Sequence, residues 1–340
     1  MWPARSAGCH GGRRSVALVA PFPYYGGKSW VAQEIWARFG DVPNFVEAFC
    51  GSAAVLLARP HDAHIETLND ADGFICNVYR AIQANPDAVA AWADYPVSEL
   101  DLHARHAWLV TQRGTLTARL AGDPYFYDAQ AAGWWLWGAC CWIGSGWCSG
   151  QGPWQVIEGE LVNTGNAGQG IHRQLPHLGN AGRGIHRQLP HLGDAGQGIH
   201  RQLPHLGDAG RETEALRAYM AALSARLRRV RICCGDWRRV LGDSPTTKLG
   251  LTGVLLDPPY PPQERDSRLY AIDTTVWEEV WTWAVAHGDD PLLRIIVCGY
   301  DGRPVPSGWT AHHWKAHGGY GSQGNGRGRE NCVREVLYCS

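Results

Sequence analysis

Four residues with clear chemical potential, Asp257-Pro258-Pro259-Tyr260, follow an apolar run at 253–256. The run is typical of a buried strand. The two prolines cannot continue a hydrogen-bonded ladder, because they lack the N–H group and have a fixed φ. The chain must therefore turn here, and the tetrad is predicted to lie just beyond the strand. In open α/β sheets this edge is where ligands bind.

The chemistry of the tetrad suits a planar amine. An exocyclic purine amine has two N–H donors, and a site that accepts both leaves the nitrogen lone pair to act as a nucleophile. The carboxylate of Asp257 and the carbonyl of Pro258, which is held in a rigid turn, could be the two acceptors. The ring of Tyr260 offers a surface on which a base could stack. Taken alone, the tetrad also fits a strand terminator with a surface acid.

Other predicted strands end in comparable residues. The run 44–49 leads into a turn at Gly51, after which Ser52 is expected to cap a short helix. The strand at 64–70 ends in Asp70, and that at 230–236 ends in Asp236. A glycine turn before a helix suits a carboxylate or phosphate, and an acid ending the next strand suits a ribose diol. A packed turn with a solvated acid fits these residues equally well.

Strands and helices alternate over 44–83, and the alternation resumes at 230. Strands are predicted at 253–256 and 293–300, with a helix at 277–286 between them. This order predicts an α/β fold with a doubly wound parallel sheet. The last segment, ending "CVREVLYCS", is expected to form an edge strand.

The expected organisation is a flexible leader at 1–20, one α/β domain made of 21–84 and 230–340, and an insertion at 85–229. The insertion is predicted to be mostly helical and is rich in tryptophan. The set Trp134, Trp135, Trp137 and Trp142 is interpreted as the core of a helical subdomain. Alternatively, an aromatic residue near 144–146 could wedge into DNA.

A 14-residue repeat occupies 165–210 within the insertion. Each full copy contains three glycines and one proline, so it cannot be a continuous helix. Each copy also places one arginine at a matching position, and these arginines could pair with phosphates along DNA: Arg173, Arg187 and Arg201. A duplicated flexible linker is the other interpretation.

The net charge is -1, so no overall positive field indicates a nucleic-acid partner, although arginines cluster at 226–231. None of the 11 cysteines forms a Cys-x-x-Cys pair. This favours a reducing, cytoplasmic setting and gives no metal site. The apolar run near the N-terminus is too short to span a membrane.

Three motifs together resemble the DNA adenine-N6 methyltransferase family, in the type whose cofactor block precedes the catalytic block. They are "PYYGGK" at 23–28, "FVEAFCGSAAV" at 45–55 and "DPPY" at 257–260, in the order of that family. The resemblance covers 21–83 and 230–300. The glycine turn is not the G-x-G-x-x-G motif of dinucleotide oxidoreductases, which argues against that class.

The resemblance implies the Rossmann-like sheet of an S-adenosylmethionine-dependent methyltransferase, with 85–229 as a target-recognition insertion. It implies transfer of a methyl group from S-adenosylmethionine to the N6 amine of adenine in double-stranded DNA. The target base would be flipped out and the transfer would be direct and in line. We expect a monomer, without a membrane partner, in the cytoplasm of a bacterial or phage-infected cell, where such enzymes can serve restriction-modification.

The resemblance also implies roles for individual residues. The catalytic tetrad comprises Asp257, Pro258, Pro259 and Tyr260, with Asp257 and Pro258 holding the amine and Tyr260 stacking on the adenine. Asp70 would hold the cofactor ribose, and Asp236 would lie near its adenine. The other cofactor-binding residues would be Tyr24, Tyr25, Gly26, Gly27, Lys28, Glu47, Ala48, Phe49, Gly51, Ser52 and Asp257 itself.

Other functions stay open at this point. The same chemistry could act on an RNA adenine or a protein glutamine, since related tetrads serve other planar amines. A catalytically silent DNA-binding protein on this fold is a further alternative, against which the intact Asp257 and Tyr260 argue.

Overall fold

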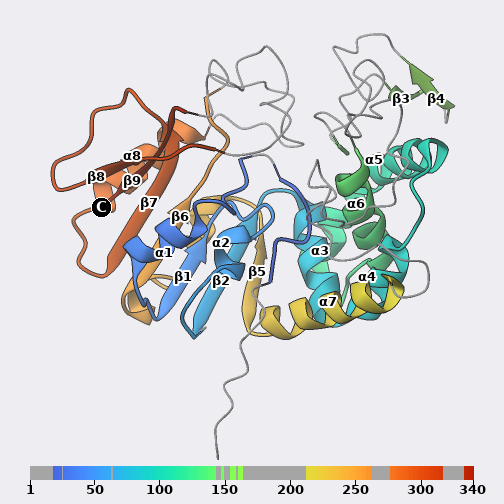
Figure 1. Cartoon of the computed structure of the whole chain (residues 1–340), viewed down its shortest axis with the longest axis horizontal. Coiled ribbons are helices and arrows are strands. Elements are labelled where there is room, and N and C mark those ends of the chain that lie inside the picture. Colours follow the sequence, from blue (N-terminus) through green and yellow to red (C-terminus); the bar gives the residue numbers. More distant parts are fainter. Residues whose placement is uncertain are drawn as a thin grey trace, which may run out of the picture.

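The computed structural model describes residues 18–24, 26–62, 64–142, 147–148, 154–157, 160–163, 212–261, 276–316 and 333–340. Their main element is a seven-stranded mixed sheet in the order β5-β2-β1-β6-β7-β9-β8 (Figure 1). The first five strands in this order are parallel, and β9 runs antiparallel to both β7 and β8. The predicted α/β fold is confirmed, and it is consistent with a Rossmann-like methyltransferase.

The strands of this sheet are β1 (Asn44–Glu47), β2 (Ile65–Asp70), β5 (Val230–Cys234), β6 (Thr252–Leu256), β7 (Leu293–Tyr300), β8 (Thr310–His313) and β9 (Glu335–Cys339). A separate hairpin pairs β3 (Trp154–Ile157) with β4 (Glu160–Asn163). The α-helices are α1 (Ala32–Phe39), α2 (Ala54–Leu57), α3 (Gly73–Ala84), α4 (Pro86–Ala93), α5 (Glu99–Gly122), α6 (Ala129–Cys141), α7 (Glu212–Leu227) and α8 (Trp277–His287).

The sheet reverses its direction of growth between β1 and β6. From β1 the chain passes to β2 and then to β5 on one side, whereas β6 returns to the other side of β1 and leads to β7. Because parallel crossovers are right-handed, helices before and after the reversal cover opposite faces. Figure 1 shows α1 and α2 in front of the sheet. The crevice at such a reversal, beyond the strand ends, is the usual ligand site.

The C-terminal strand corrects the sequence prediction. β9 was expected at an edge, but it lies between β7 and β8, and all five of its residues are buried. The short, partly exposed β8 forms that edge and was not predicted. Strand β9 is therefore covered on both faces, which explains why its sequence is nearly continuously apolar.

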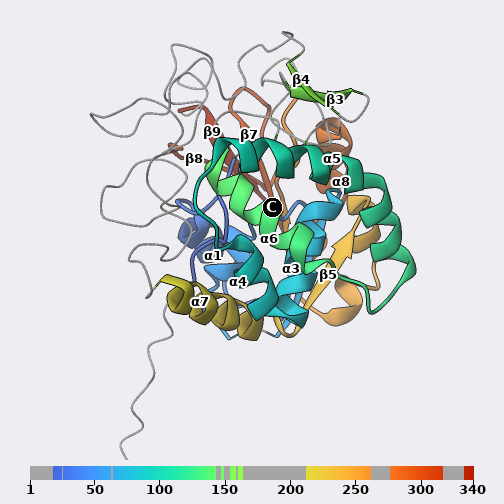
Figure 2. The ribbon, with the colours of Figure 1, turned by 90° about the vertical axis from the view of Figure 1, so that its right-hand side faces the viewer.

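The insertion helices share a core with the sheet domain. Helices α4 and α6 pack on each other and on α3, and α4 also packs on α7, as Figure 2 shows from that side. Trp135, Trp137 and Trp142 are buried in the same apolar cluster as the sheet residues. Three of the four tryptophans are thus buried, but in a core shared with the sheet and not in that of a separate helical subdomain, and Trp134 is half-buried. The alternative DNA wedge at 144–146 and the 165–210 repeat lie outside the described residues.

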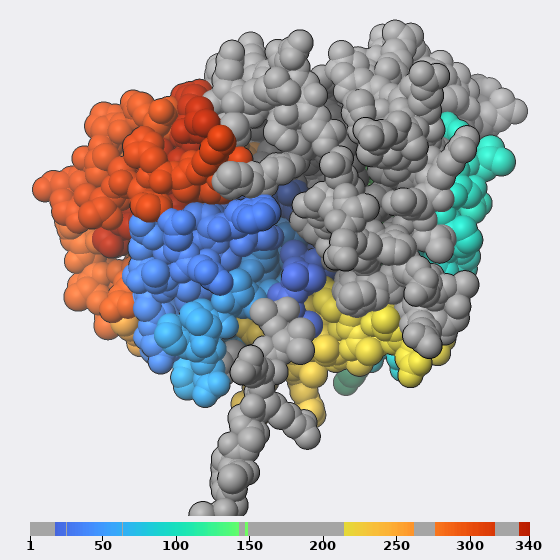
Figure 3. Space-filling view, viewed as in Figure 1, coloured from blue at the N-terminus to red at the C-terminus, as the bar shows by residue number. Residues whose placement is uncertain are grey.

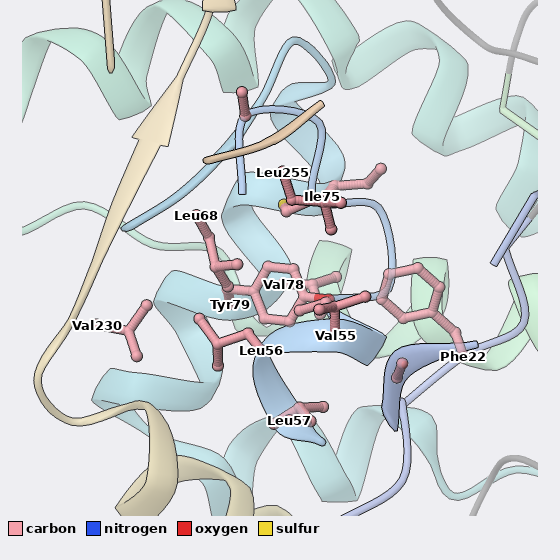
Figure 4. Packing of buried hydrophobic residues seen from close by; sticks show 14 of the residues in the cluster. Phe22, Val55, Leu56, Leu57, Leu68, Ile75, Val78, Tyr79, Val230 and Leu255 are labelled. Atoms are coloured by element: carbon pink, nitrogen blue, oxygen red, sulfur yellow. The ribbon is translucent and has the colours of Figure 1, made fainter. Parts of the chain in front are cut away.

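Gly26, Gly27 and Lys28 form a loop, called the glycine loop below. The segment before it is anchored to the shared core. Phe22 is fully buried and its ring meets that of Trp135 edge to face, with centroids 4.8 Å apart. Figure 4 shows Phe22 beside Val55 and Tyr79. The hydroxyl of Tyr219 on α7 donates to the carbonyl of Val19 over 2.7 Å. Residues 18–20, at the end of the expected leader, are therefore held in place.

Among the helices that the structure describes, none combines the length and apolarity needed to cross a bilayer.

In the space-filling view, the C-terminal residues in orange and red lie directly beside the N-terminal residues in blue (Figure 3). Segments at the two ends of the sequence thus meet on this face.

A buried ion pair joins α7 to the sheet. The guanidinium of Arg226 donates to both carboxylate oxygens of Glu66, over 2.6 and 2.8 Å, and also to the carbonyl of Leu56. We expect Arg226→Ala to lower the free energy of unfolding by about 2 kcal/mol, because Glu66 would lose its bidentate partner and keep only Arg59, at 3.4 Å. Denaturant unfolding monitored by circular dichroism measures this.

The exposed Arg228, at the end of the same helix, provides the matched control. Arg228→Ala should change the free energy of unfolding by no more than about 0.5 kcal/mol. Equal effects of the two substitutions would contradict the assigned role of Arg226.

Candidate active site at the strand ends

The site is built around an ion pair between Lys28 and Asp257. The ammonium lies 2.8 Å from the Asp257 carboxylate and also donates to the carbonyl of Gly26 over 2.7 Å. Only 4% of the Lys28 side chain and 19% of the Asp257 side chain are exposed. The glycine loop is thereby fastened to the C-terminal end of β6.

The two charges stabilise each other against burial. Burial alone lowers the pKa of Lys28, but the charge of Asp257, followed by Cys298 and Glu335, raises that pKa above its ordinary value. Burial raises the pKa of Asp257, while the Lys28 charge and hydrogen bonds from Lys28 and Cys298 lower it in part. The opposite charge in contact with each group favours its charged form and counteracts the effect of burial.

Tyr260 lies beside this pair and is tied to the distant strand β9. Its hydroxyl is 2.8 Å from the Glu335 carboxylate, and its ring meets that of Tyr300 edge to face at 4.5 Å. The Lys28 ammonium lies 5.7 Å from the Tyr260 ring centroid and 5.9 Å from that of Trp314. Tyr260 itself is only 7% exposed.

Glu47, at the end of β1, faces the same region. One of its oxygens accepts from the N–H of Leu56 over 3.2 Å, so Glu47 satisfies a free amide of the short helix α2. The expected cap, Ser52, does not fulfil this role: the cap position is Ala53, which makes no side-chain cap bond. Burial raises the pKa of Glu47 well above its usual range.

Asp70 closes the turn after β1 from the neighbouring strand. One oxygen accepts from the N–H of Gly51 over 3.0 Å, and the other accepts from the N–H of Asp72 over 2.9 Å. Burial raises the pKa of Asp70 to about 6, although these backbone hydrogen bonds oppose the shift. The Cys50 thiol also lies 4.0 Å from the oxygen that accepts from Gly51.

The turn itself adopts a conformation that explains its glycine. Gly51 has φ +44°, and a Cβ atom there would lie 2.4 Å from the ring of Tyr24. Its carbonyl accepts from the buried hydroxyl of Tyr79 over 2.8 Å. Ala53 is also left-handed, with φ 54°, which is costly for a residue with a Cβ. Such strain is typical of functional turns.

Asp236 lies at the same sheet edge but on the surface. Its carboxylate accepts from the N–H and the guanidinium of Arg238, over 2.8 and 3.0 Å, and Arg238 also pairs with Glu279. The Asp236 side chain is 51% exposed. Its neighbour Trp237 is buried and packs against Phe49, with ring centroids 6.3 Å apart.

The remaining predicted residues shape the backbone around the site. Gly27 donates to the Tyr24 carbonyl over 3.1 Å, which forms a tight turn. The backbone of Ala48 bridges β6 and β2, through Leu255 and the side chain of Asn69. Ser52 and Pro258 are buried, and Pro259 is half-buried. Tyr25 lies outside the described residues.

Three residues near the tetrad were missed by the sequence analysis: Cys298, Trp314 and Glu335. Cys298 lies on β7, Trp314 follows β8 and Glu335 begins β9. A charged residue opening an otherwise apolar strand was the available signal for Glu335. No local pattern indicated the other two.

The charges of the site favour a cationic ligand. Three buried or largely buried carboxylates, of Glu47, Asp257 and Glu335, interact electrostatically with the single ammonium of Lys28. Burial favours the neutral form of these carboxyl groups, and a ligand with its own positive charge would favour their ionised form. Within the described residues, no three His, Cys, Asp or Glu side chains are grouped to hold a metal ion.

The conformation of the turn yields a stability test. Gly51→Ala should lower the free energy of unfolding by about 2 kcal/mol, because the left-handed backbone and the Tyr24 ring both oppose a Cβ. Gly114→Ala, in helix α5 with nothing within 4 Å of the added Cβ, is the control. It should stabilise the protein by about 0.5–1 kcal/mol, and chemical denaturation compares the two. A neutral Gly51→Ala would refute the described turn.

Comparison with known proteins agrees with the resemblance seen in the motifs. No protein of curated function matches the chain at a significant level. The family model for D12 class N6 adenine-specific DNA methyltransferases matches residues 24–106, which include the glycine loop, Glu47, Gly51 and Asp70. The tetrad at 257–260 lies outside this match. Residues 24–106 are thus similar to the family that the three motifs resemble, the D12 class of N6 adenine-specific DNA methyltransferases.

Proposed function

We propose that the protein is a site-specific DNA methyltransferase that transfers a methyl group from S-adenosylmethionine to the N6 amine of adenine. The observation that carries this proposal is the position of Asp257. It ends β6 at the reversal of the sheet, and it belongs to the same buried cluster as Lys28 of the glycine loop. A family match to D12 class N6 adenine-specific DNA methyltransferases supports the same activity.

The residues present fit S-adenosylmethionine. The positive charge of a sulfonium would favour the ionised forms of the buried carboxyl groups around Lys28, and an acid at the end of a strand, such as Asp70, suits a ribose diol. Lys28 and the glycine loop would hold the methionine part, and Glu47 and Gly51 would shape the pocket. The cofactor, when bound, supplies an already activated methyl group, so the chain need only position the reactants.

Asp257 would accept one hydrogen of the target amine, and the carbonyl of Pro258 would accept the other. Lys28 occupies one oxygen of Asp257, but a carboxylate has about four acceptor positions and can take a further donor. The Asp257 carboxylate would also stabilise the positive charge that develops on N6. These residues thus act by hydrogen bonding and electrostatics.

The adenine has to leave the double helix to reach Asp257. Stacking on Tyr260 would offset part of the cost of extrusion, but the ring is only 7% exposed. Binding of the base would therefore require some uncovering of this ring. We assign target recognition on double-stranded DNA to the insertion at 85–229, by its place between the cofactor and catalytic residues.

Loss of the Asp257 carboxylate provides the main test. Asp257→Ala should reduce methyl transfer to unmethylated genomic DNA by at least about a thousandfold, because the amine loses a charged acceptor. Incorporation of labelled methyl groups measures the rate, and sequencing for N6-methyladenine identifies the product and the target sequence. Calorimetry should find that the variant still binds S-adenosylmethionine.

The exposed Asp289 serves as control, since Asp289→Ala should keep the wild-type rate. Wild-type activity in Asp257→Ala would disprove the catalytic assignment. Methylation of RNA or of protein glutamine in place of DNA would assign the same chemistry to a different substrate.

The raised pKa of Asp70 predicts that cofactor binding depends on pH. Its pKa of about 6 means that the carboxylate becomes protonated as the pH falls through 6 and stops accepting from both ribose hydroxyls. The affinity for S-adenosylmethionine should therefore fall about tenfold between pH 7 and pH 5. Calorimetric titration over this range, repeated with Asp70→Asn, separates Asp70 from the other carboxylates.

The Asp70→Asn variant should bind weakly at pH 7 and show little further loss by pH 5. If the variant retained the full pH dependence of the wild type, Asp70 would not be the group responsible.

A further inference from the structure

Glu335 is a buried carboxylate that contacts Tyr260 of the tetrad, although the two residues are 75 positions apart in the sequence. It is the first residue of β9 and pairs in register with Tyr300 at the end of β7. The four residues that follow it in the strand are apolar and buried. A carboxylate at such a position is costly unless it has specific partners.

The first partner is Tyr260, whose hydroxyl lies 2.8 Å from the Glu335 carboxylate. Both residues are only 7% exposed, so water does not compete strongly for this bond. The ring of Tyr300 meets the Tyr260 ring at 78° from another direction. The hydroxyl end and the ring of Tyr260 are therefore both held, which leaves the ring little freedom to tilt.

The second partner is the Lys28–Asp257 pair. Glu335 interacts electrostatically with the Lys28 ammonium, which Asp257 contacts directly. Burial raises the pKa of Glu335, while the Lys28 charge and the Tyr260 hydroxyl lower it in part. Both glutamate contacts thus lead to residues of the proposed catalytic site.

We infer that Glu335 is a positioning residue for methyl transfer: it fixes the orientation of the Tyr260 ring. This inference rests on the proposed function. Glu335 need not touch the adenine or the cofactor. Its effect on the reaction passes through Tyr260, so removal of the tyrosine hydroxyl should also remove most of the effect of Glu335.

A double-mutant cycle tests this dependence. The variants are Glu335→Gln, which keeps the shape and an acceptor oxygen, Glu335→Ala, Tyr260→Phe, and Tyr260→Phe combined with Glu335→Gln. The matched control is Asp301→Asn. Asp301 pairs with Arg334, next to Glu335 in the chain, and its side chain is 41% exposed.

The measurements are the single-turnover rate of methyl transfer to unmethylated genomic DNA and, separately, calorimetric binding of S-adenosylmethionine. We expect the rate to fall about tenfold to a hundredfold in Glu335→Ala and by less in Glu335→Gln. Cofactor affinity should change by no more than about threefold. In the Tyr260→Phe background, Glu335→Gln should slow the reaction by less than about twofold.

A merely structural role would give a different result. It would lower the midpoint of denaturant unfolding in the Glu335 variants while the rate per folded molecule stayed at the wild-type value, as expected for Asp301→Asn. That result, or equal effects of Glu335→Gln with and without the Tyr260 hydroxyl, would overturn the inference. Failure of the wild type to methylate DNA would instead overturn the proposed function, and the positioning role with it.

Discussion

The ion pair between Lys28 and Asp257 is the constraint on which the rest of the site depends. Removing two charges from water costs several kcal/mol for each ion, and only close contact with good geometry compensates for that cost. The pair meets this requirement at 2.8 Å, with a backbone carbonyl as further acceptor for the ammonium. The glycine loop and the end of β6 must consequently approach each other, although the sequence separates them widely.

The position of the glycine loop also depends on contacts made by the residues that precede it, and helices of the insertion make some of these contacts. Phe22, two residues before Tyr24, packs against Trp135 of α6. Tyr219 of α7 holds the backbone of Val19. Helices of the proposed recognition segment therefore contact the chain segment, around Val19 and Phe22, that leads to Lys28. Changes in how that segment packs can reach the catalytic residues through well-packed aromatic rings, because tightly packed interiors transmit displacements.

The parallel part of the sheet was predictable because each strand is a local apolar run that ends in a turn or an acid. This pattern located Glu47, Asp70 and Asp257 at one edge. It could not locate Glu335 or β8, because their places depend on antiparallel pairing with residues distant in the chain. Sequence also could not distinguish the surface ion pair of Asp236 from the buried hydrogen bonds of Asp70, since both acids simply end a strand.

The raised pKa values of the carboxyl groups show which residues of this site destabilise the folded state. A carboxyl group whose pKa is higher in the folded than in the unfolded state destabilises the fold at pH values above both. Asp70, Asp257 and Glu335 all shift in this direction, chiefly through burial. Lys28 offsets only part of the cost for the last two. A cationic ligand among these carboxylates would relieve more of this cost, so the same burial that destabilises the fold favours binding of a positively charged group.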